Sequence, residues 1–174
     1  MESLEKFAQS KLAALEAQNL RRRLVETDRT DSVHVLRGGR RLISFCCNDY
    51  LNLSHHEEVK AAAMEATRRL GAGAGASRLV SGNHSLYREL EEALARLKGT
   101  DDACVFGSGY LANLGIIPSL VGPGDLVLAD ALSHACLMAG GKLSGAEILI
   151  FRHNDMAHAR GLLQTHRNQY RHCL

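Results

Sequence analysis

Short apolar runs alternate with segments of helical length in the second half of the chain, and this alternation most restricts its fold. The runs are bounded by turn residues, as buried strands are: Ala103–Phe106, Asp125–Ala129 and Glu147–Phe151. Strands that alternate with helices favour a parallel sheet with helices on both faces. We therefore expect an α/β domain in this part of the chain.

A small-residue turn, Gly107-Ser108-Gly109, follows the first run and leads into a helix expected from Leu111 to Val121. The N-terminus of a helix offers free backbone N–H groups and the positive end of the helix dipole, which together bind anions. Ser108 adds a hydroxyl, and the glycines let an anion approach the backbone closely. The turn therefore predicts a phosphate site; a purely structural turn is the alternative on this motif alone.

His134 follows the second run, within the segment Asp130–Ala135. Ligands of open α/β sheets bind at the carboxyl ends of the strands. The expected phosphate site and His134 each come after such an end, so the sequence favours one pocket that both face. A histidine that only satisfies local hydrogen bonds is the alternative.

Composition excludes several classes of protein. The chain has 174 residues, 45% of them hydrophobic, which suffices for the core of one domain. A net charge of +2 gives no reason to expect nucleic acid or membrane as a partner. No apolar run reaches bilayer length and the first residues lack the layout of a secretory signal, so we expect a cytoplasmic protein.

The cysteines and histidines predict no metal or disulfide framework. Five cysteines lie without C-x-x-C spacing and mostly within apolar runs, which favours reduced thiols. His153 and His158 are not spaced i,i+4, and no acidic or thiol partner is patterned with them.

The first half of the chain is expected to form helices, a hairpin and loops. In order, these are an amphipathic helix over Leu4–Arg23, a polar break at Asp28–Ser32, a β-hairpin of Val33–Leu36 and Arg41–Phe45 around Gly38-Gly39, and a helix that opens with a capping box at Ser54–Glu57 and ends at Gly71.

Further helices are expected in the second half. Asn83 or Ser85 caps one that stops at Gly99, a short one ends at Gly140-Gly141, and Asn154 or Asp155 caps one that runs through His166. The apolar end, Tyr170–Leu174, is typical of the start of another strand. We therefore expect an incomplete domain over residues 46–174, preceded by a segment of residues 1–45.

The segment Gly71–Ala76 fits the pattern G-x-G-x-x-A of dinucleotide-binding folds. That fingerprint requires a strand before it and a helix directly after it, whereas a charged helix precedes this segment. The context excludes a nicotinamide site. A loop poor in side chains, which lets substrate or another backbone come close, is the better interpretation.

Several motifs in register resemble those of the α-oxoamine synthases, pyridoxal-phosphate enzymes of the fold-type I aminotransferase superfamily, and within that family its oxononanoate-synthase branch. The resemblance covers nearly the whole chain. The motifs are Leu20–Arg23, Asn48–Ser54, Ser77–Gly82, Glu89–Glu92, Ser108–Asn113, Asp130–Ala135 and His153–Asp155.

The resemblance implies an aspartate-aminotransferase-like fold, here the first part of the large domain with its parallel-type sheet and flanking helices, preceded by the N-terminal helix and hairpin. It implies a decarboxylative condensation of an amino acid, L-alanine, with a pimeloyl thioester on coenzyme A or carrier protein, as in biotin biosynthesis, within a homodimer. Aminolevulinate synthases, glycine acetyltransferases and serine palmitoyltransferases are the alternatives inside the family. A non-catalytic dimerisation module is the alternative outside it.

The resemblance also implies roles for particular residues. Ser108, Gly109 and Tyr110 would hold the phosphate and edge of pyridoxal 5′-phosphate. His134 would act in catalysis, by stacking on the pyridine ring and hydrogen-bonding the substrate carboxylate.

On the substrate side, the implied residues are spread along the chain. Arg21 would meet the acyl substrate, Asn48 and Tyr50 would line the amino-acid side, and Ser77 would leave room for an alanine methyl group.

The lysine that would form the Schiff base with this cofactor has no counterpart here, nor has the acidic partner of the pyridinium nitrogen. Lys60, Lys98 and Lys142 fall on expected helices or helix ends and match no family lysine. We therefore expect that this chain alone does not turn over substrate.

Overall fold

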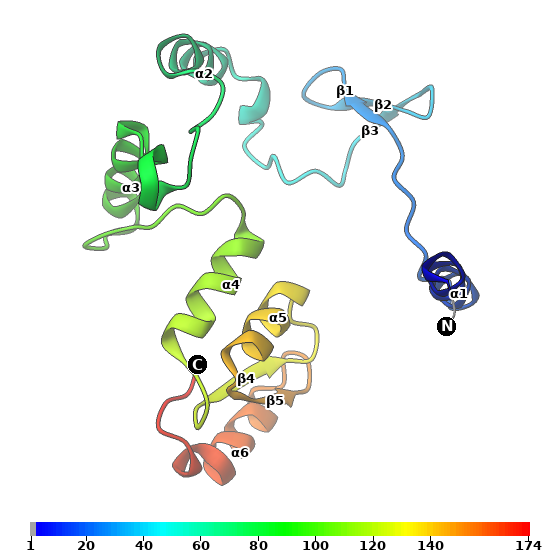
Figure 1. Cartoon of the computed structure of the whole chain (residues 1–174), viewed down its shortest axis with the longest axis vertical. Coiled ribbons are helices and arrows are strands. Elements are labelled where there is room, and N and C mark those ends of the chain that lie inside the picture. Colours follow the sequence, from blue (N-terminus) through cyan, green and yellow to red (C-terminus); the bar gives the residue numbers. More distant parts are fainter. Residues whose placement is uncertain (1–2) are drawn as a thin grey trace. The chain divides into compact units, whose positions relative to one another are not determined.

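The structure is a computed structural model that describes residues 3–174, and Figure 1 traces its elements in chain order. The chain forms two compact units, Met1–Ala74 and Gly75–Leu174. Each unit is a body of its own and is described separately below. The expected division at residue 46 remains a prediction.

The first unit begins with helix α1, Leu4–Ala17, whose first turn is capped by the Ser3 hydroxyl accepting from the Lys6 N–H at 3.3 Å. The expected helix to Arg23 is wrong in its last part. Asn19 adopts a left-handed conformation (φ 55°) just after the helix, and the arginines that follow lie outside it. Asparagine tolerates this conformation, which ends helices.

A three-stranded antiparallel sheet follows in the order β1-β2-β3, with β1 at Thr27–Arg29, β2 at His34–Arg37 and β3 at Arg40–Ile43. The expected hairpin is confirmed. Its turn residues Gly38 and Gly39 both have positive φ, 53° and 75°, which suits the twist of a two-residue hairpin.

The expected polar break at Asp28–Ser32 is wrong at its start, because β1 reaches Arg29. This strand pairs with β2 at the edge of the sheet, where Thr27 and Asp28 are exposed and only Arg29 is half-buried, so it needs no alternating apolar pattern.

The 3₁₀ turn η1, Leu53–His55, leads into helix α2, Glu57–Leu70. The expected capping box is wrong: the N-cap residue is His56, and no side chain caps this end. Ser54 lies inside η1, where its backbone N–H donates to Asp49 instead. The expected helix end is confirmed, since Gly71 follows it with φ 87°.

The second unit opens with a π-helical turn, η2, at Arg78–Gly82, and helix α3 at Ser85–Lys98. Neither expected cap of α3 is present, because its N-cap is His84 without a side-chain hydrogen bond. The side-chain Oδ1 of Asn83 accepts from Arg78 Nε at 2.8 Å and is therefore not available to cap the helix. The expected stop at Gly99 is confirmed, with φ 68°.

The expected strand at Ala103–Phe106 is wrong; this segment has no regular secondary structure and pairs with no strand among residues 3–174. Its backbone groups bond to side chains instead. The Val105 N–H donates to Glu91 at 2.8 Å, and the Val105 carbonyl accepts from Arg78 at 3.2 Å. An apolar run alone does not supply the neighbouring strand that a ladder requires.

The remaining elements form the α/β body expected from the sequence. They are α4 at Gly109–Leu120, β4 at Leu126–Asp130, α5 at Ala135–Ser144, β5 at Glu147–Phe151, α6 at Met156–His166 and the 3₁₀ turn η3 at Arg167–Gln169. Strands β4 and β5 are parallel and lie between α5 and α6 in Figure 1. The core lies where α4 meets the sheet, at Ile117, Val121 and Val127, with Ala146 and Ile148 against it.

The apolar end of the chain pairs with the edge of the sheet, in agreement with the expected strand character. Cys173 forms a parallel bridge with Leu126 of β4, and the Leu128 N–H donates to the Leu174 carbonyl at 2.8 Å. Every helix among residues 3–174 is too short or too polar to span a lipid bilayer.

Helix α5 does not end at Gly140-Gly141 as expected but continues to Ser144 and ends at Gly145. The glycine pair serves close packing. A Cβ on Gly140 would lie 2.7 Å from the Asn113 carbonyl oxygen, and one on Gly141 would lie 2.9 Å from Ile148 Cδ1. Glycine inside a helix therefore marks contact with α4 and β5 here, not a stop.

Candidate functional site

The N-terminus of α4 carries Ser108, Gly109 and Tyr110, which we call the phosphate cradle. Ser108 is the N-cap: its hydroxyl accepts from the Leu111 N–H at 3.2 Å, and its carbonyl accepts from the Ala112 N–H at 3.0 Å. Because the first N–H groups of a helix have no partner within it, those of Gly109 and Tyr110 are available to a ligand.

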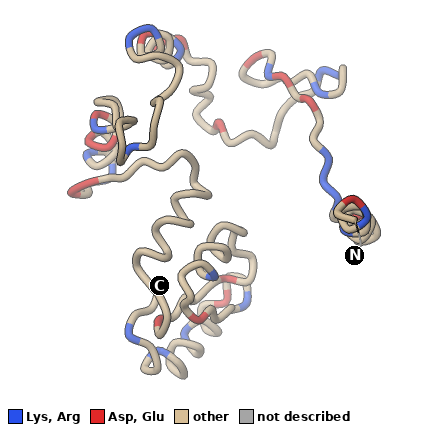
Figure 2. The backbone as a smooth tube through the Cα atoms, viewed as in Figure 1, with Lys and Arg blue, Asp and Glu red and all other residues tan. Residues whose placement is uncertain are grey.

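The surroundings of the cradle suit an anion. A Cβ on Gly109 would meet no atom within 4 Å, so the backbone is open to close approach. Figure 2 shows that α4 carries no charged side chain, and its first turn therefore holds no carboxylate to oppose the helix dipole. The site can hold a phosphate on backbone donors alone.

His134 is the N-cap of α5, and its side chain is exposed. Its Nδ1 accepts from the Cys136 backbone N–H at 3.2 Å and lies 2.8 Å from Cys136 Sγ. Because Nδ1 acts as an acceptor, the neutral ring carries its proton on Nε2 and offers a donor there.

Packing of α4 against α5 brings the cradle and His134 into one neighbourhood. Asn113, in the second turn of α4, donates from Nδ2 to Cys136 Sγ at 3.1 Å, and Cys136 in turn contacts His134. The roles in cofactor binding remain predictions, but the structure does bring these helix ends together.

A cavity of about 350 Å³ lies at the carboxyl end of β4, beside these helices. Its walls are mainly apolar, with Asn113, Asp130 and Ser133 as the polar lining, and the other lining residues are Ile116, Ile117, Val127, Leu128, Ala129, Leu137, Phe151 and Leu174. The cradle and His134 are not part of this lining.

Sequence reasoning missed a cluster around Asp130, the last residue of β4. Its carboxylate accepts from the backbone N–H groups of Asn154 at 2.9 Å and Leu132 at 2.7 Å, and His153 Nδ1 lies 2.9 Å away. These contacts, the Asn154 N–H foremost, lower the pKa of Asp130 to about 2. The signal was present in the sequence, because Asp130 and His153-Asn154 follow the carboxyl ends of neighbouring parallel strands.

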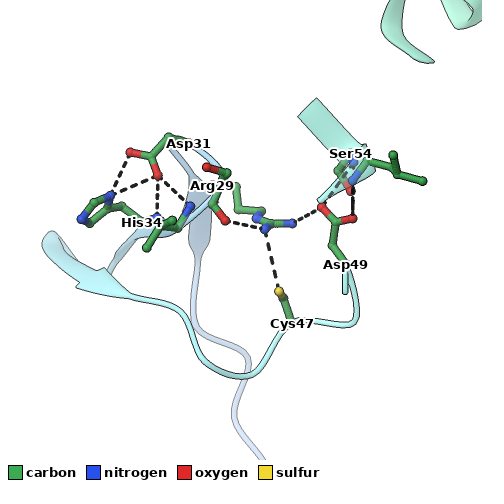
Figure 3. Close-up of polar contacts among 9 residues, drawn as sticks. Arg29, Asp31, His34, Cys47, Asp49 and Ser54 are labelled. Atoms are coloured by element: carbon green, nitrogen blue, oxygen red, sulfur yellow. Dashed lines mark hydrogen bonds and ion pairs between the residues drawn. The ribbon is translucent and has the colours of Figure 1, made fainter. Parts of the chain in front are cut away.

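In the first unit, Asn48 and Tyr50 flank Asp49 in the chain, and Figure 3 shows the polar contacts of Asp49. The Asp49 carboxylate accepts from Arg29 Nη1 and from the Leu53 N–H, both at 2.8 Å. Tyr50 is 88% exposed. The turn therefore presents its side chains outward from a rigid base, which a binding role requires; that role remains a prediction.

Two further predicted site residues lie on exposed segments. Arg21 Nη1 donates to Glu16 at 2.8 Å, and Arg23 pairs with the same carboxylate at 3.2 Å. Ser77 is exposed, and its carbonyl accepts from the N–H groups of Val80 and Gly82 at the start of η2. The substrate roles of Arg21 and Ser77 remain predictions.

Lys60, Lys98 and Lys142 lie on helices α2, α3 and α5, and Lys60 pairs with Glu57 at 2.6 Å. Within residues 3–174, no three His, Cys, Asp or Glu side chains form a group able to hold a metal ion. All five cysteines are free thiols.

The match to a known family follows from the sequence. Residues 40–173 match the profile of the family described as aminotransferase class I and II, which is well over half of the chain. The chain therefore belongs to this family, and its predicted place among the fold-type I pyridoxal-phosphate enzymes is confirmed.

Among individual proteins, the chain is similar to two 8-amino-7-oxononanoate synthases. Identity to that of Methylocella silvestris is 66% over 142 residues, which are 82% of this chain and 41% of that protein. Identity to that of Beijerinckia indica subsp. indica is 58% over 174 residues, 100% of this chain and 45% of that protein. The chain thus spans less than half the length of these curated relatives.

Solved structures confirm the expected fold. Sphingomonas wittichii serine palmitoyltransferase matches with a TM-score of 0.79 and 33% identity, over 91% of this chain and 41% of that one. A serine palmitoyltransferase variant from S. paucimobilis with bound PLP-myriocin aldimine matches with a TM-score of 0.82 and 31% identity, over 94% of this chain and 44% of that one. The 8-amino-7-oxononanoate synthase of Francisella tularensis matches with a TM-score of 0.57 and 28% identity, over 69% of this chain and 32% of that one.

Proposed function

We propose that this chain is the part of an 8-amino-7-oxononanoate synthase that seats the phosphate of pyridoxal 5′-phosphate. The reaction is the decarboxylative condensation of L-alanine with a pimeloyl thioester, in biotin biosynthesis, by a cytoplasmic homodimer. The names of the relatives support the activity. The observation that carries the cofactor site is the pair of available N–H groups at Gly109 and Tyr110, near His134.

The residues of the second unit fit the cofactor in their chemistry. Gly109 and Tyr110 donate backbone N–H groups to the phosphate, and the ring of Tyr110, 48% exposed, has room to contact the cofactor edge. When bound, the cofactor serves as an electron sink for the carbanion of the amino acid. The cradle holds the dianion in place and orients the ring that it carries.

His134 contributes a flat ring and a directed proton. With Nδ1 occupied by the Cys136 N–H, Nε2 carries the proton and donates it in a hydrogen bond to the substrate carboxylate. The same imidazole stacks on the pyridine ring. Both roles orient the amino acid, and neither requires His134 to lose its proton.

The substrate side is proposed to draw on the remaining predicted residues. Asn48 and Tyr50 line the amino-acid pocket from the turn held by Asp49, and Arg21 binds the acyl substrate after exchanging its contact with Glu16. Ser77 leaves room for the alanine methyl group. Because Glu16 already holds Arg21, a carboxylate or phosphate of the substrate replaces one anion with another.

Serine palmitoyltransferase activity is the second candidate, because solved structures of that enzyme match this chain with high TM-scores. The test uses the protein at the length of its relatives. It is incubated with L-alanine, glycine or L-serine and with pimeloyl, short-chain or palmitoyl thioester, and products are identified by mass spectrometry. Only the alanine and pimeloyl pair should give efficient turnover. Preference for serine and palmitoyl thioester would refute the proposal.

The 174-residue chain alone is proposed to bind the cofactor without turnover, because it carries no counterpart of the family lysine. Borohydride reduction in the presence of the cofactor, followed by peptide mapping, tests this. We expect no stoichiometric adduct on Lys60, Lys98 or Lys142. A single lysine labelled to completion at low cofactor concentration would contradict it. A non-catalytic dimerisation module remains the alternative if the chain binds no cofactor at all.

A further inference from the structure

Arg78 and Glu91 form the most extensively bonded ion pair of the second unit. Arg78 Nη1 and Nη2 donate to the two carboxylate oxygens of Glu91 at 2.6 and 2.9 Å, a bidentate arrangement. The guanidinium also lies 4.4 Å from the centre of the Tyr87 ring. The side chains of Arg78 and Glu91 are 33% and 15% exposed, so the ion pair is partly shielded from water.

The pair holds the segment Ala103–Phe106, which leads into the phosphate cradle. Glu91 accepts from the Val105 N–H at 2.8 Å, and Arg78 donates to the Val105 carbonyl at 3.2 Å. The next residue, Phe106, packs on α4: its Cε1 would lie 2.8 Å from a Cβ on Gly115. The backbone is therefore held on both sides just before Ser108.

The same guanidinium holds the loop that carries Ser77. Arg78 Nε donates to Asn83 at 2.8 Å, across the π-helical turn η2. The turn is tight, since a Cβ on Gly82 would overlap the Ala76 carbonyl. One arginine thus connects the Ser77 loop, helix α3 and the approach to the cradle.

We propose that Arg78 is a positioning residue, which together with Glu91 sets the phosphate cradle in its binding geometry and ties it to the Ser77 loop. This inference rests on the proposed function, because it assumes that the cradle binds phosphate. It assigns a task to Arg78 and Glu91, which lie in the motifs Ser77–Gly82 and Glu89–Glu92 and have no part in the proposed cofactor and substrate sites. The low pKa of Glu91, about 2, is due first to Arg78 and then to the Val105 N–H, and agrees with a permanently charged clamp.

A purely structural ion pair makes a different prediction from a positioning one. Loss of a structural pair lowers the stability of the unit and weakens every ligand alike. Loss of a positioning pair moves the cradle, so it weakens the binding of ligands that carry a phosphate and leaves the binding of ligands without one unchanged. Pyridoxal 5′-phosphate and pyridoxal differ only in that group.

The test uses the whole 174-residue chain and the variant Arg78→Lys, which keeps the charge but removes the fork that makes the bidentate contact. The matched control is Arg88→Lys. Arg88 is exposed and pairs with Glu92 at 2.8 Å on α3, the helix that also carries Glu91. Glu91→Gln is the second variant and provides the measurement if Arg78→Lys does not fold. Circular dichroism checks folding in each case.

Two kinds of measurement are made on each protein. The first is the affinity for pyridoxal 5′-phosphate and for pyridoxal. The second, by nuclear magnetic resonance, is the rate of hydrogen exchange at the Val105 amide together with the chemical shifts of the Gly107–Tyr110 amides. We expect Arg78→Lys to lower the affinity for pyridoxal 5′-phosphate about tenfold, as loss of one charge-assisted hydrogen bond would. The affinity for pyridoxal should stay unchanged. Val105 should exchange faster and the cradle shifts should move. Arg88→Lys should change neither.

Equal weakening of both ligands, or cradle amides that stay in place in Arg78→Lys, would overturn the inference. If the unaltered chain binds neither pyridoxal 5′-phosphate nor inorganic phosphate, the proposed function fails. The exchange and shift comparison still decides in that case whether Arg78 positions the cradle, so the two failures are distinguishable.

Discussion

Asp130 illustrates at the scale of one residue how a carboxylate can bind two segments of the sheet edge together. It ends β4, yet its partners are the N–H of Asn154 after β5 and the imidazole of His153. The pKa of Asp130 is lowered from 3.8 to about 2, so ionised Asp130 stabilises the folded unit above pH 3.8. That stabilisation is lost as the pH falls through about 2.

Asp130→Asn should therefore be less stable than the unaltered chain at pH 7 and should lose less stability between pH 3.8 and about 2. Urea unfolding at a series of pH values measures this. Asp101→Asn is the control, because Asp101 is an exposed carboxylate of the same unit. Identical acid profiles for Asp130→Asn and the unaltered chain would contradict the assigned contacts.

Glycines inside helices divide into two kinds in this chain. A Cβ on Gly140 would lie 2.7 Å from the Asn113 carbonyl and 2.9 Å from Ile117 Cδ1, whereas one on Gly161 in α6 would meet nothing within 4 Å. Gly140→Ala should lower the free energy of unfolding by about 1–3 kcal/mol through overpacking. Gly161→Ala should raise it by about 0.5–1 kcal/mol, since alanine favours helix. Denaturant unfolding measures both; equal effects would refute the packing role of Gly140.

Some of the site was predictable from residue types and some was not. Ser108 follows a small-residue turn signal, so its position at a helix N-terminus could be predicted from the sequence. For His134 the sequence predicted only its place after the strand β4, not its role as the N-cap of α5. The environment of Cys136 could not be predicted, because its contact with Asn113 spans 23 positions and depends on helix packing. Gly140 was misjudged for the same reason: its neighbours come from another helix.

At the scale of elements, boundaries that depend on local chemistry were predicted better than those that depend on tertiary partners. The hairpin turn and the stops at Gly71 and Gly99 follow from the conformational freedom of glycine. The caps at Ser54, Asn83 and Ser85 were wrong because such side chains have several possible partners. The prediction of a strand at residues 103–106 was wrong because a strand requires a neighbouring strand, and the local sequence does not show whether one is present.

Helix α6 is capped by Asp155, one of the two residues that the sequence predicted for this role. Asp155 accepts from the His158 N–H at 2.8 Å and also pairs with Arg152. Asp155→Ala should lower Tm by roughly 2–5 °C through loss of the cap. Arg152→Ala removes only the exposed ion pair and should change Tm little. Thermal unfolding followed by circular dichroism separates the two, and equal shifts would attribute the effect to the ion pair instead.

At the scale of the whole molecule, large apolar side chains remain uncovered. Leu24, Phe45 and Leu79 are 104%, 93% and 100% exposed, and they come from both units. Surfaces of this kind mark protein contacts. The chain also spans only 41–45% of the relatives described above, and the homodimer is proposed from their family.

The isolated chain should therefore self-associate. Sedimentation velocity over a range of concentrations measures this, and the apparent mass should rise with concentration. Addition of the remaining part of a relative, supplied as a separate chain, should reduce the association by covering apolar surface. A strictly monomeric chain at every concentration would contradict the expectation.

The central claim is that Gly109 and Tyr110 seat the phosphate of pyridoxal 5′-phosphate near His134. Titration of the isotope-labelled chain with this cofactor, followed by nuclear magnetic resonance, tests it most directly. The account predicts saturable shifts that are largest at the amides of Gly109 and Tyr110 and at the ring of His134, with inorganic phosphate competing at the amides. Absence of saturation, or shifts confined to the unit Met1–Ala74, would contradict it.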